Sequence, residues 1–370
     1  MNKPFLMFAP WGTWLFPPPQ RWEIWTRSLV SSSILAFLPL QLPQILRNAA
    51  MIASNDPLQI AQLQVIPLLG YASGMLANLL LMSYLADRQE LWGTIVQSLG
   101  VITSGIVVTQ LFSVGLVDPR LFGILALGVS VGFLFNFGRL WLPRITPSSP
   151  ELAPELGQTR FDRYWSWWQN GLNILGLTLF PLILTVQLHD SLIPQLPLEI
   201  GMGSASLLFG LSSTTLLGSA NVLGSANWME LTNNNPLLLS FHSLIQLFRR
   251  HWSTLSGWTA NLLFMFGPTA QLINNIAHPE SIAALSLSTQ FLSVLGNLLI
   301  LARSGTLWIQ GHDRVWAVGG VWEVILRGLV FSTIAYFGFM PFQWLGLYGL
   351  GVSLYFLWIY SNARQSRFTT

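Results

Sequence analysis

The sequence predicts an all-helical integral membrane protein. Only 8% of its 370 residues are charged, and the mean hydropathy is +0.54, above the range of ordinary soluble domains. Apolar stretches of about 20 residues recur along nearly the whole chain, and about 20 helical residues cross a hydrocarbon core of roughly 30 Å. The chain also repeats one polar pattern, which indicates two related bundles of helices.

We expect ten transmembrane helices. They cover 28–52, 62–86, 91–114, 120–142, 166–189, 199–222, 253–277, 283–303, 315–337 and 341–361. The fifth and sixth are the weakest, because Pro181 interrupts one and Ser and Gly dilute the other. Both are tolerable, since neighbouring helices satisfy freed backbone groups and small residues favour close packing. Without these two helices, eight spans remain.

The basic residues predict that both termini lie on the inner side of the membrane. With ten spans, 14 of the 17 Lys and Arg residues fall on one side, Arg47 and Arg120 fall on the other, and Arg327 lies within a helix. This is a strong positive-inside bias. Removing both weak spans preserves the bias, whereas removing one would invert the second half. The basic residues lie at membrane edges, so the net charge of +3 does not indicate a nucleic-acid partner.

The same polar pattern occurs twice, some 220 residues apart. The matching residues are Gln44, Asn48 and Asn78 in the first copy and Gln271, Asn275 and Asn297 in the second. The first and seventh spans are separated by six crossings, an even number, so we expect parallel repeats. In transporters built from such repeats, the substrate site lies near the middle of the membrane between the copies.

The copies define the expected organisation of the chain. The segments are an interfacial, Trp- and Pro-rich region (1–27), a first unit of a three-helix bundle plus one helix (28–142), a linker with two further helices (143–250), a second unit (251–361) and a tail (362–370). Indole rings prefer the headgroup zone, which is why the first segment is assigned to the interface.

Neutral amides at membrane depth predict a pocket for a polyol. An amide offers a donor and an acceptor together, as a sugar hydroxyl requires, and an aromatic ring can cover the apolar face of a pyranose. The expected substrate-binding residues are Asn78, Asn297, Gln97, Gln44, Gln271, Tyr84 and Trp322. The alternative role of each amide is a hydrogen bond between helices. Trp92 and Trp316 begin their helices, so we expect them to be interfacial anchors.

Glu323 and Arg327 form a possible coupling pair. They lie four residues apart in the ninth span, so they share one helix face and can pair. Either the pair neutralises itself and fixes helix packing, or Glu323 carries a proton that is coupled to transport.

Enzyme activity and cofactors are not predicted. The chain has no cysteine, which excludes disulfides, thiolate metal sites and cysteine nucleophiles. Its five histidines are dispersed without metal-ligand spacing, and no phosphate-binding glycine loop is present. The first residues, MNKPFLMFAPWGTW, follow neither a secretory nor an organelle-targeting plan, which favours a bacterial chain or one already processed.

Several segments resemble known sugar transporters. The Pro43–Gln44 pair, followed by an Ala-Asn step in the next helix, resembles the PQ-loop proteins, which include the SWEET transporters of parallel three-helix repeats. LQLPQILRNA (40–49), PLLGYASGMLANLLLMSYLA (67–86), VQSLGVITSGIVVTQL (96–111), LSGWTANLLFMFGPTAQLINNIAHPESIAALS (255–286) and GNLLILAR (296–303) are similar to the plastid maltose excess proteins, the maltose exporters.

This resemblance implies a facilitator of maltose, or of glucose, that works by alternating access without nucleotide or metal. It implies a plastid inner envelope or a cyanobacterial plasma membrane, and it places Asn78, Asn297 and Gln97 where PQ-loop transporters contact sugar. The chain departs from SWEET proteins at Leu81 and Ile300, where their second helices carry a pocket tryptophan. A PQ-loop transporter of another solute such as an amino acid, a non-transporting receptor or scaffold, and a homo-oligomer all stay open.

Overall fold

The computed structural model describes residues 18–63, 66, 68–141, 160–191, 197–208, 254–277, 279, 282 and 287–367. All regular secondary structure in these residues is helical. The helices are α2 (Pro19–Ala53), α3 (Pro57–Gln62), α4 (Leu68–Asp87), α5 (Leu91–Ser113), α6 (Pro119–Trp141), α7 (Arg160–Ser191), a short apolar helix (Leu198–Leu208), α11 (Leu255–Ala277), α12 (Leu287–Ile309), α13 (Val315–Tyr336) and α14 (Phe342–Arg367).

The helices agree with the expected membrane protein. Seven of them, namely α2, α5, α6, α7, α12, α13 and α14, are long and apolar enough to cross a membrane. At 1.5 Å per residue, the 20 residues of α4 and the 23 of α11 also reach about 30 Å. The expected sixth span begins as the helix Leu198–Leu208, and its remainder lies outside the described residues. The all-helical class is therefore confirmed, and the count of ten stays a prediction.

The expected interfacial segment, residues 1–27, overlaps the first described helix. From Pro19 onwards it is the first part of α2, with a proline at the start of the helix, where the missing N–H costs no hydrogen bond. Trp22 is 1% exposed, donates from Nε1 to Thr306 Oγ1 at 3.1 Å, and meets Trp358 edge-on at 4.9 Å. Trp22 is therefore a core residue that joins three helices. The rest of that segment, residues 1–17, lies outside the described residues.

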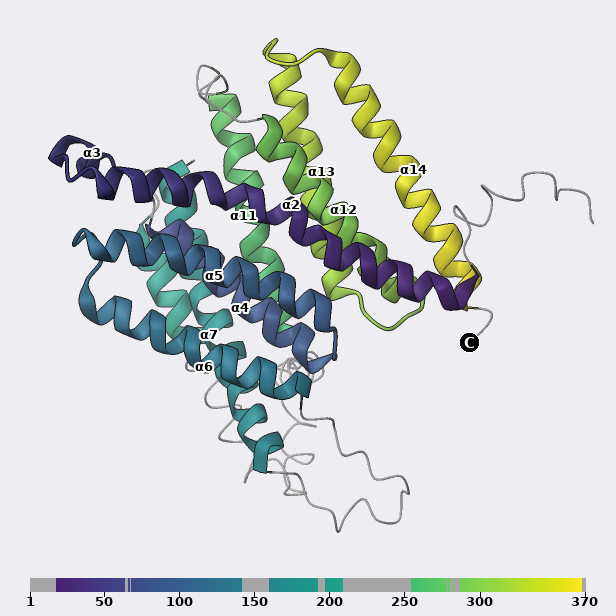
Figure 1. The fold of residues 1–370 in the computed structure, drawn as a ribbon, viewed down its shortest axis with the longest axis horizontal. Coiled ribbons are helices and arrows are strands. Elements are labelled where there is room, and N and C mark those ends of the chain that lie inside the picture. The colour runs from purple at the N-terminus through teal and green to yellow at the C-terminus, as the bar shows by residue number, and fades with distance from the viewer. Residues whose placement is uncertain are drawn as a thin grey trace, which may run out of the picture.

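The two expected copies pack in the same internal order. In the first, α5 packs against both α2 and α4, and in the second, α13 packs against both α11 and α12. Across the copies, α2 packs against α12, and α4 packs against α11 (Figure 1). The first helix of each copy thus lies against the second helix of the other, and these four helices form the seam of the molecule.

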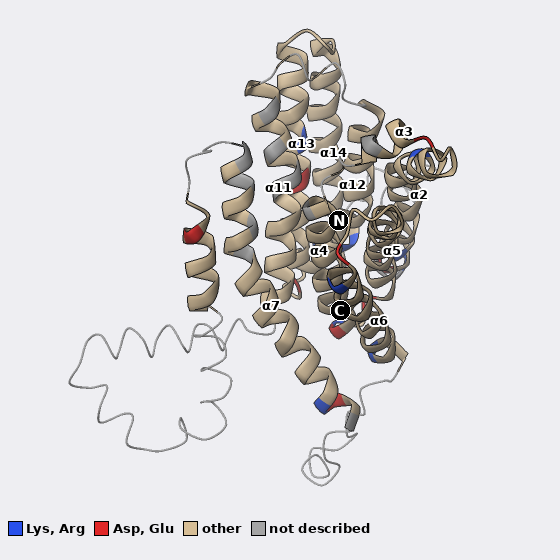
Figure 2. Cartoon of the chain, turned by 90° about the vertical axis from the view of Figure 1, so that its left-hand side faces the viewer, with Lys and Arg blue, Asp and Glu red and all other residues tan. Residues whose placement is uncertain are grey.

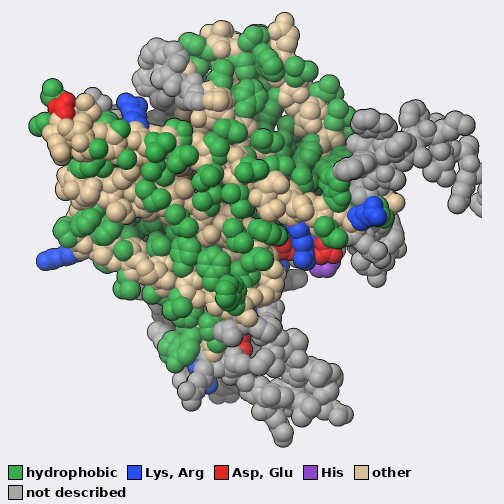
Figure 3. All heavy atoms as spheres, viewed as in Figure 1, with side chains coloured by type: hydrophobic (Ala, Val, Ile, Leu, Met, Phe, Trp, Pro, Cys, Tyr) green, Lys and Arg blue, Asp and Glu red, His purple; other side chains and the backbone are tan. Residues whose placement is uncertain are grey.

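The remaining helices surround this seam. α6 packs against α4 and α5, α7 against α11 and α4, and α14 against α12, α13 and α2. Charged residues are sparse along the helices (Figure 2), and hydrophobic side chains are spread over the face seen in Figure 3. In a bilayer, such apolar helix faces meet lipid, because the helical backbone groups are already hydrogen-bonded internally.

Candidate functional site

A cavity of about 630 Å³ lies at the seam. Its walls come from α2, α4, α5, α11, α12 and α13, so each copy contributes three helices. Its volume is within the roughly 300–1,000 Å³ of typical small-molecule sites. Gly70, at the start of α4, lines the cavity and is exposed, whereas Trp316, near the start of α13, lines it and is 2% exposed. The cavity therefore reaches the surface near Gly70.

Asn78 and Asn297 line this cavity from equivalent helices. Asn78 Nδ2 donates to Gly74 O at 2.7 Å, and Asn297 Nδ2 donates to Ser293 O at 2.9 Å. Each bond runs to the carbonyl four residues earlier, so each amide is held by its own helix. Each bond uses one of the two N–H groups, and the second N–H and the oxygen remain for another partner. The structure thus brings the predicted pair together.

The repeated glutamines, Gln44 and Gln271, have different surroundings. Gln44 lines the cavity and donates to Asn48 Oδ1 at 2.7 Å, and Asn48 donates to Gln110 of α5 at 3.1 Å. In the second copy, Gln271 donates to Asn275 Oδ1 at 2.8 Å, but Gln271 is absent from the cavity lining.

The role of the buried asparagine is the same in both copies. Asn275 donates to Thr333 Oγ1 of α13 at 2.9 Å, as Asn48 donates to α5. These chains tie the first helix of each copy to its third helix. Gln271 makes the same bond as Gln44 but lies outside the cavity lining, so the bond itself does not decide which glutamine reaches the cavity.

Of the other expected site residues, Gln97 lines the cavity, but Tyr84 and Trp322 do not. Tyr84 is 1% exposed and donates its hydroxyl to Asp313, and Trp322 is 43% exposed on the outer surface. The rings in the lining are instead Phe37, Tyr71, Phe264 and Trp316. The expected interfacial role of Trp316 is thus wrong. Leu81 and Ile300, where the SWEET tryptophan would lie, also line the cavity.

Glu323 and Arg327 form the expected pair and line the cavity. Arg327 Nε lies 2.9 Å from Glu323 Oε1, and the two side chains are 17% and 12% exposed. Ser293 Oγ donates to the same Glu323 oxygen at 3.4 Å, and Arg327 also donates to Gln290 Oε1. Glu323 Oε2 is buried and has no hydrogen-bond partner within the described part of the chain.

Two glycines, which sequence inspection did not single out, bring backbone next to the cavity amides. Gly100 of α5 lies under the Asn78 side chain, and Gly319 of α13 lies under the Asn261 side chain, which donates to Val315 O. A Cβ at either glycine would collide with the neighbouring amide. The glycines of α5 and α13 were visible in the sequence as a sign of close helix packing. Which of them contacts an amide depends on where the helices cross.

Cross-copy contacts lie beyond the cavity asparagines, toward the carboxyl ends of α4 and α12, and we call this region the charged end. Arg303 Nη2 of α12 lies 2.7 Å from Glu90 Oε1, just before α5, and Tyr84 of α4 donates to Asp313 Oδ1 at 2.8 Å, just before α13. Arg88 Nε also lies 3.6 Å from Asp313 Oδ2. Tyr84 and Arg303 each lie six residues after the cavity asparagine of their helix (84 − 78 and 303 − 297).

These observations define the class of protein. The chain is a multi-pass helical membrane protein whose two similarly ordered helix triplets enclose a polar cavity. Residues 18–141 match the family model described as the maltose excess protein 1 N-terminal domain.

Two relatives carry the same family name over most of this chain. The chain is 29% identical over 322 residues to "Maltose excess protein 1, chloroplastic" of Arabidopsis thaliana, which covers 86% of this chain and 65% of the relative. It is 30% identical over 314 residues to "Maltose excess protein 1-like, chloroplastic" of Oryza sativa subsp. japonica, covering 84% and 65%. The chain belongs to the maltose excess protein family, as its sequence segments predicted. It spans about two thirds of the length of these relatives. No solved structure matches it significantly.

The glycine beneath Asn78 provides a test of this geometry. We expect Gly100→Ala to lower the thermal unfolding temperature in detergent, because the new Cβ must displace a cavity amide. Gly105→Ala on the same helix is the control, since no atom lies within 4 Å of an added Cβ. There we expect a gain of up to about 1 kcal/mol from reduced chain entropy. Equal responses of both variants would contradict the assigned contact.

Proposed function

We propose that this protein transports a neutral sugar, maltose first and glucose second, by alternating access through the seam cavity. The observation that carries this proposal is the pair Asn78 and Asn297, held in the same way on equivalent helices and lining one cavity. A cavity shared by two copies can open to either side of a membrane when the copies rock against each other. No residue in this proposal performs covalent chemistry.

The names of the relatives support maltose as the solute and a plastid membrane as the location. A cyanobacterial plasma membrane is the second candidate location. The order of packing, with the third helix between the first two in each copy, supports parallel repeats of the PQ-loop type. With ten spans, both termini would lie on the stromal or cytoplasmic side.

The lining suits a polyol with apolar ring faces. Asn78 and Asn297 each retain an N–H donor and an oxygen acceptor, so each can bind a hydroxyl. The rings of Phe37, Tyr71 and Trp316 can cover the C–H faces of the sugar. Glu323 also lines the cavity, and its buried Oε2 has no hydrogen-bond donor from the described residues. The lining thus offers polar partners around an apolar slot.

The charged end supplies the closed side of the transport cycle. The Arg303–Glu90 and Tyr84–Asp313 contacts join the copies on the side of the cavity away from Gly70. Since α4 and α12 each carry a cavity asparagine and, six residues later, a closing residue, a tilt of either helix moves both positions together. Opening this end therefore requires both cross-copy contacts to separate.

The central test is flux into liposomes. We expect purified protein to exchange labelled maltose without ATP. Asn78→Ala or Asn297→Ala should weaken exchange about 2- to 13-fold, the effect of losing one hydrogen bond of about 0.5–1.5 kcal/mol. Asn362→Ala is the control, because Asn362 makes the same bond to its own helix, Nδ2 to Trp358 O at 2.8 Å, outside the cavity.

A panel of solutes separates the alternatives. Normal maltose exchange in both asparagine variants would contradict the cavity as the sugar site. Exchange of an amino acid in place of sugars would favour another PQ-loop solute. Absence of any protein-dependent flux would favour a receptor or scaffold.

Proton coupling through Glu323 has its own test. If Glu323 carries the proton, Glu323→Gln abolishes the response of maltose flux to a proton gradient while exchange at equal pH continues. Asp118→Asn, on the exposed connection before α6, is the matched control, because an amide oxygen can still cap that helix. An unchanged gradient response in Glu323→Gln leaves the pair a structural one.

The charged end is tested by exchanging charges. We expect Arg303→Glu to lower maltose exchange more than about tenfold, because two buried acids then face each other, and Glu90→Arg in the same chain to restore part of it. Arg120→Glu is the control, since Arg120 is exposed at the start of α6, away from the charged end. If the double variant is as slow as the single variant, the bridge does not gate transport.

A further inference from the structure

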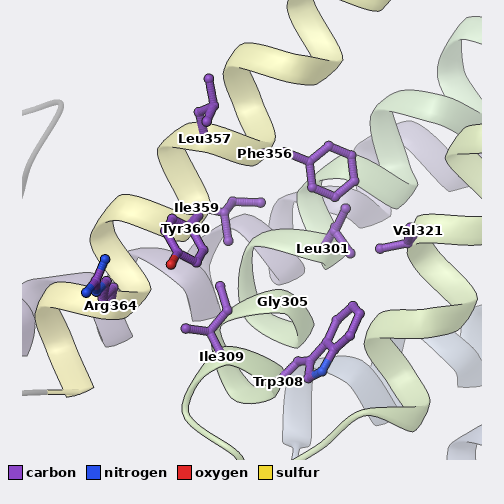
Figure 4. A pocket seen from close by; sticks show the side chains of 10 residues that line it. All are labelled: Leu301, Gly305, Trp308, Ile309, Val321, Phe356, Leu357, Ile359, Tyr360 and Arg364. Atoms are coloured by element: carbon purple, nitrogen blue, oxygen red, sulfur yellow. The ribbon is translucent and has the colours of Figure 1, made fainter.

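A second cavity lies on the outer side of the second copy, away from the seam. It has a volume of about 800 Å³ and lies between α12, α13 and α14 (Figure 4). Its lining residues are Leu301, Gly305, Trp308, Ile309, Val321, Phe356, Leu357, Ile359, Tyr360 and Arg364. None of them lines the seam cavity, so this groove is a separate site.

The groove is apolar, and its three helices are each long and apolar enough to cross a membrane. Leu357 and Tyr360 of α14 are 61% and 50% exposed, so the groove opens toward the surroundings of the protein. Water would gain few hydrogen bonds from these walls, whereas a hydrocarbon chain would replace the lost apolar contacts. Gly305 leaves space in the groove because it has no side chain, and a Cβ placed there would lie 3.4 Å from Ile359.

One end of the groove is cationic. Arg364 lies one helical turn beyond Tyr360, is exposed, and makes no ion pair with any residue that the structure describes. In Figure 4, Arg364 lies at one end of the lining and Leu357 at another, with Phe356 and Leu301 between helices. Trp308 is 41% exposed on the same groove. Arginine and tryptophan together at a helix end are typical of headgroup depth.

The position in the molecule agrees with this depth. Arg364 lies near the end of α14, and Gln310, the residue after α12, donates to Ser366 of α14 at 3.0 Å. Both helix ends are on the side of the charged end, since Arg303 lies in the same last turns of α12. A guanidinium there can bind two phosphate oxygens at once.

We propose that this groove binds one anionic phospholipid, with its phosphate on Arg364 and an acyl chain along Leu301, Val321 and Phe356. A neutral phosphatidylcholine headgroup also carries a phosphate, but its choline cation cancels that charge. One arginine near a membrane surface therefore favours an anionic headgroup by about fivefold. This lipid site is independent of the proposed sugar transport, because the two cavities share no residue.

The test uses the full chain, stripped of lipid in detergent and mixed with equal amounts of phosphatidylglycerol and phosphatidylcholine with identical acyl chains. Native mass spectrometry counts the lipids retained. We expect the wild-type protein to hold one phosphatidylglycerol in preference to phosphatidylcholine by about fivefold. Arg364→Gln removes this preference, and Gly305→Leu, which fills the groove, lowers retention of both lipids.

Arg120→Gln is the matched control, because Arg120 is also an exposed arginine at a helix end but lies on α6, away from the groove. It keeps the wild-type preference. Equal retention of both lipids by the wild type, an unchanged preference in Arg364→Gln, or a lipid-free dimer that covers the groove would each overturn the proposal. Because Arg364 is exposed, we expect Arg364→Gln to fold even if Gly305→Leu does not. The lipid preference of Arg364→Gln is then sufficient to test the proposal.

Discussion

The structure depends on one constraint: at membrane depth, polar side chains must find hydrogen-bond partners within the protein. Asn48 and Asn275 meet it by joining the first helix of each copy to its third, through Gln110 and Thr333. Asn78 and Asn297 meet it by bonding their own helices. The latter two bonds use only one N–H group of each amide. The second N–H group and the oxygen of Asn78 and Asn297 can therefore bind another partner in the seam cavity.

The two copies share a scaffold but do not present the same surface to the cavity. α5 contributes Gln97 and the bare backbone of Gly100, whereas α13 contributes Glu323 and Arg327. A solute in the seam thus meets neutral groups on one side and an ion pair on the other. This asymmetry supports a solute with two unlike ends or faces, and it gives the second copy the only charged groups among the described lining residues.

α4 and α12 connect the cavity to the charged end. Each helix holds a cavity asparagine and, six residues later, a residue that bridges to the opposite copy. In the proposed transport cycle, a small tilt of either helix would change both positions together. The lipid groove lies on the other side of α12, where α14 packs. A lipid there would touch the same helix that carries Asn297 and Arg303.

The sequence by itself determined the helical class, the positions of most helices, the family and the matching positions of Asn78 and Asn297, because apolar length and a repeated pattern are local properties. Only the tertiary structure decided which polar and aromatic side chains face the seam. Gln271, Tyr84 and Trp322 lie outside the cavity lining, and Trp316 lies within it. The reason is physical: which side of a helix faces a cavity depends on where the other helices cross it, and no single helix encodes those crossings.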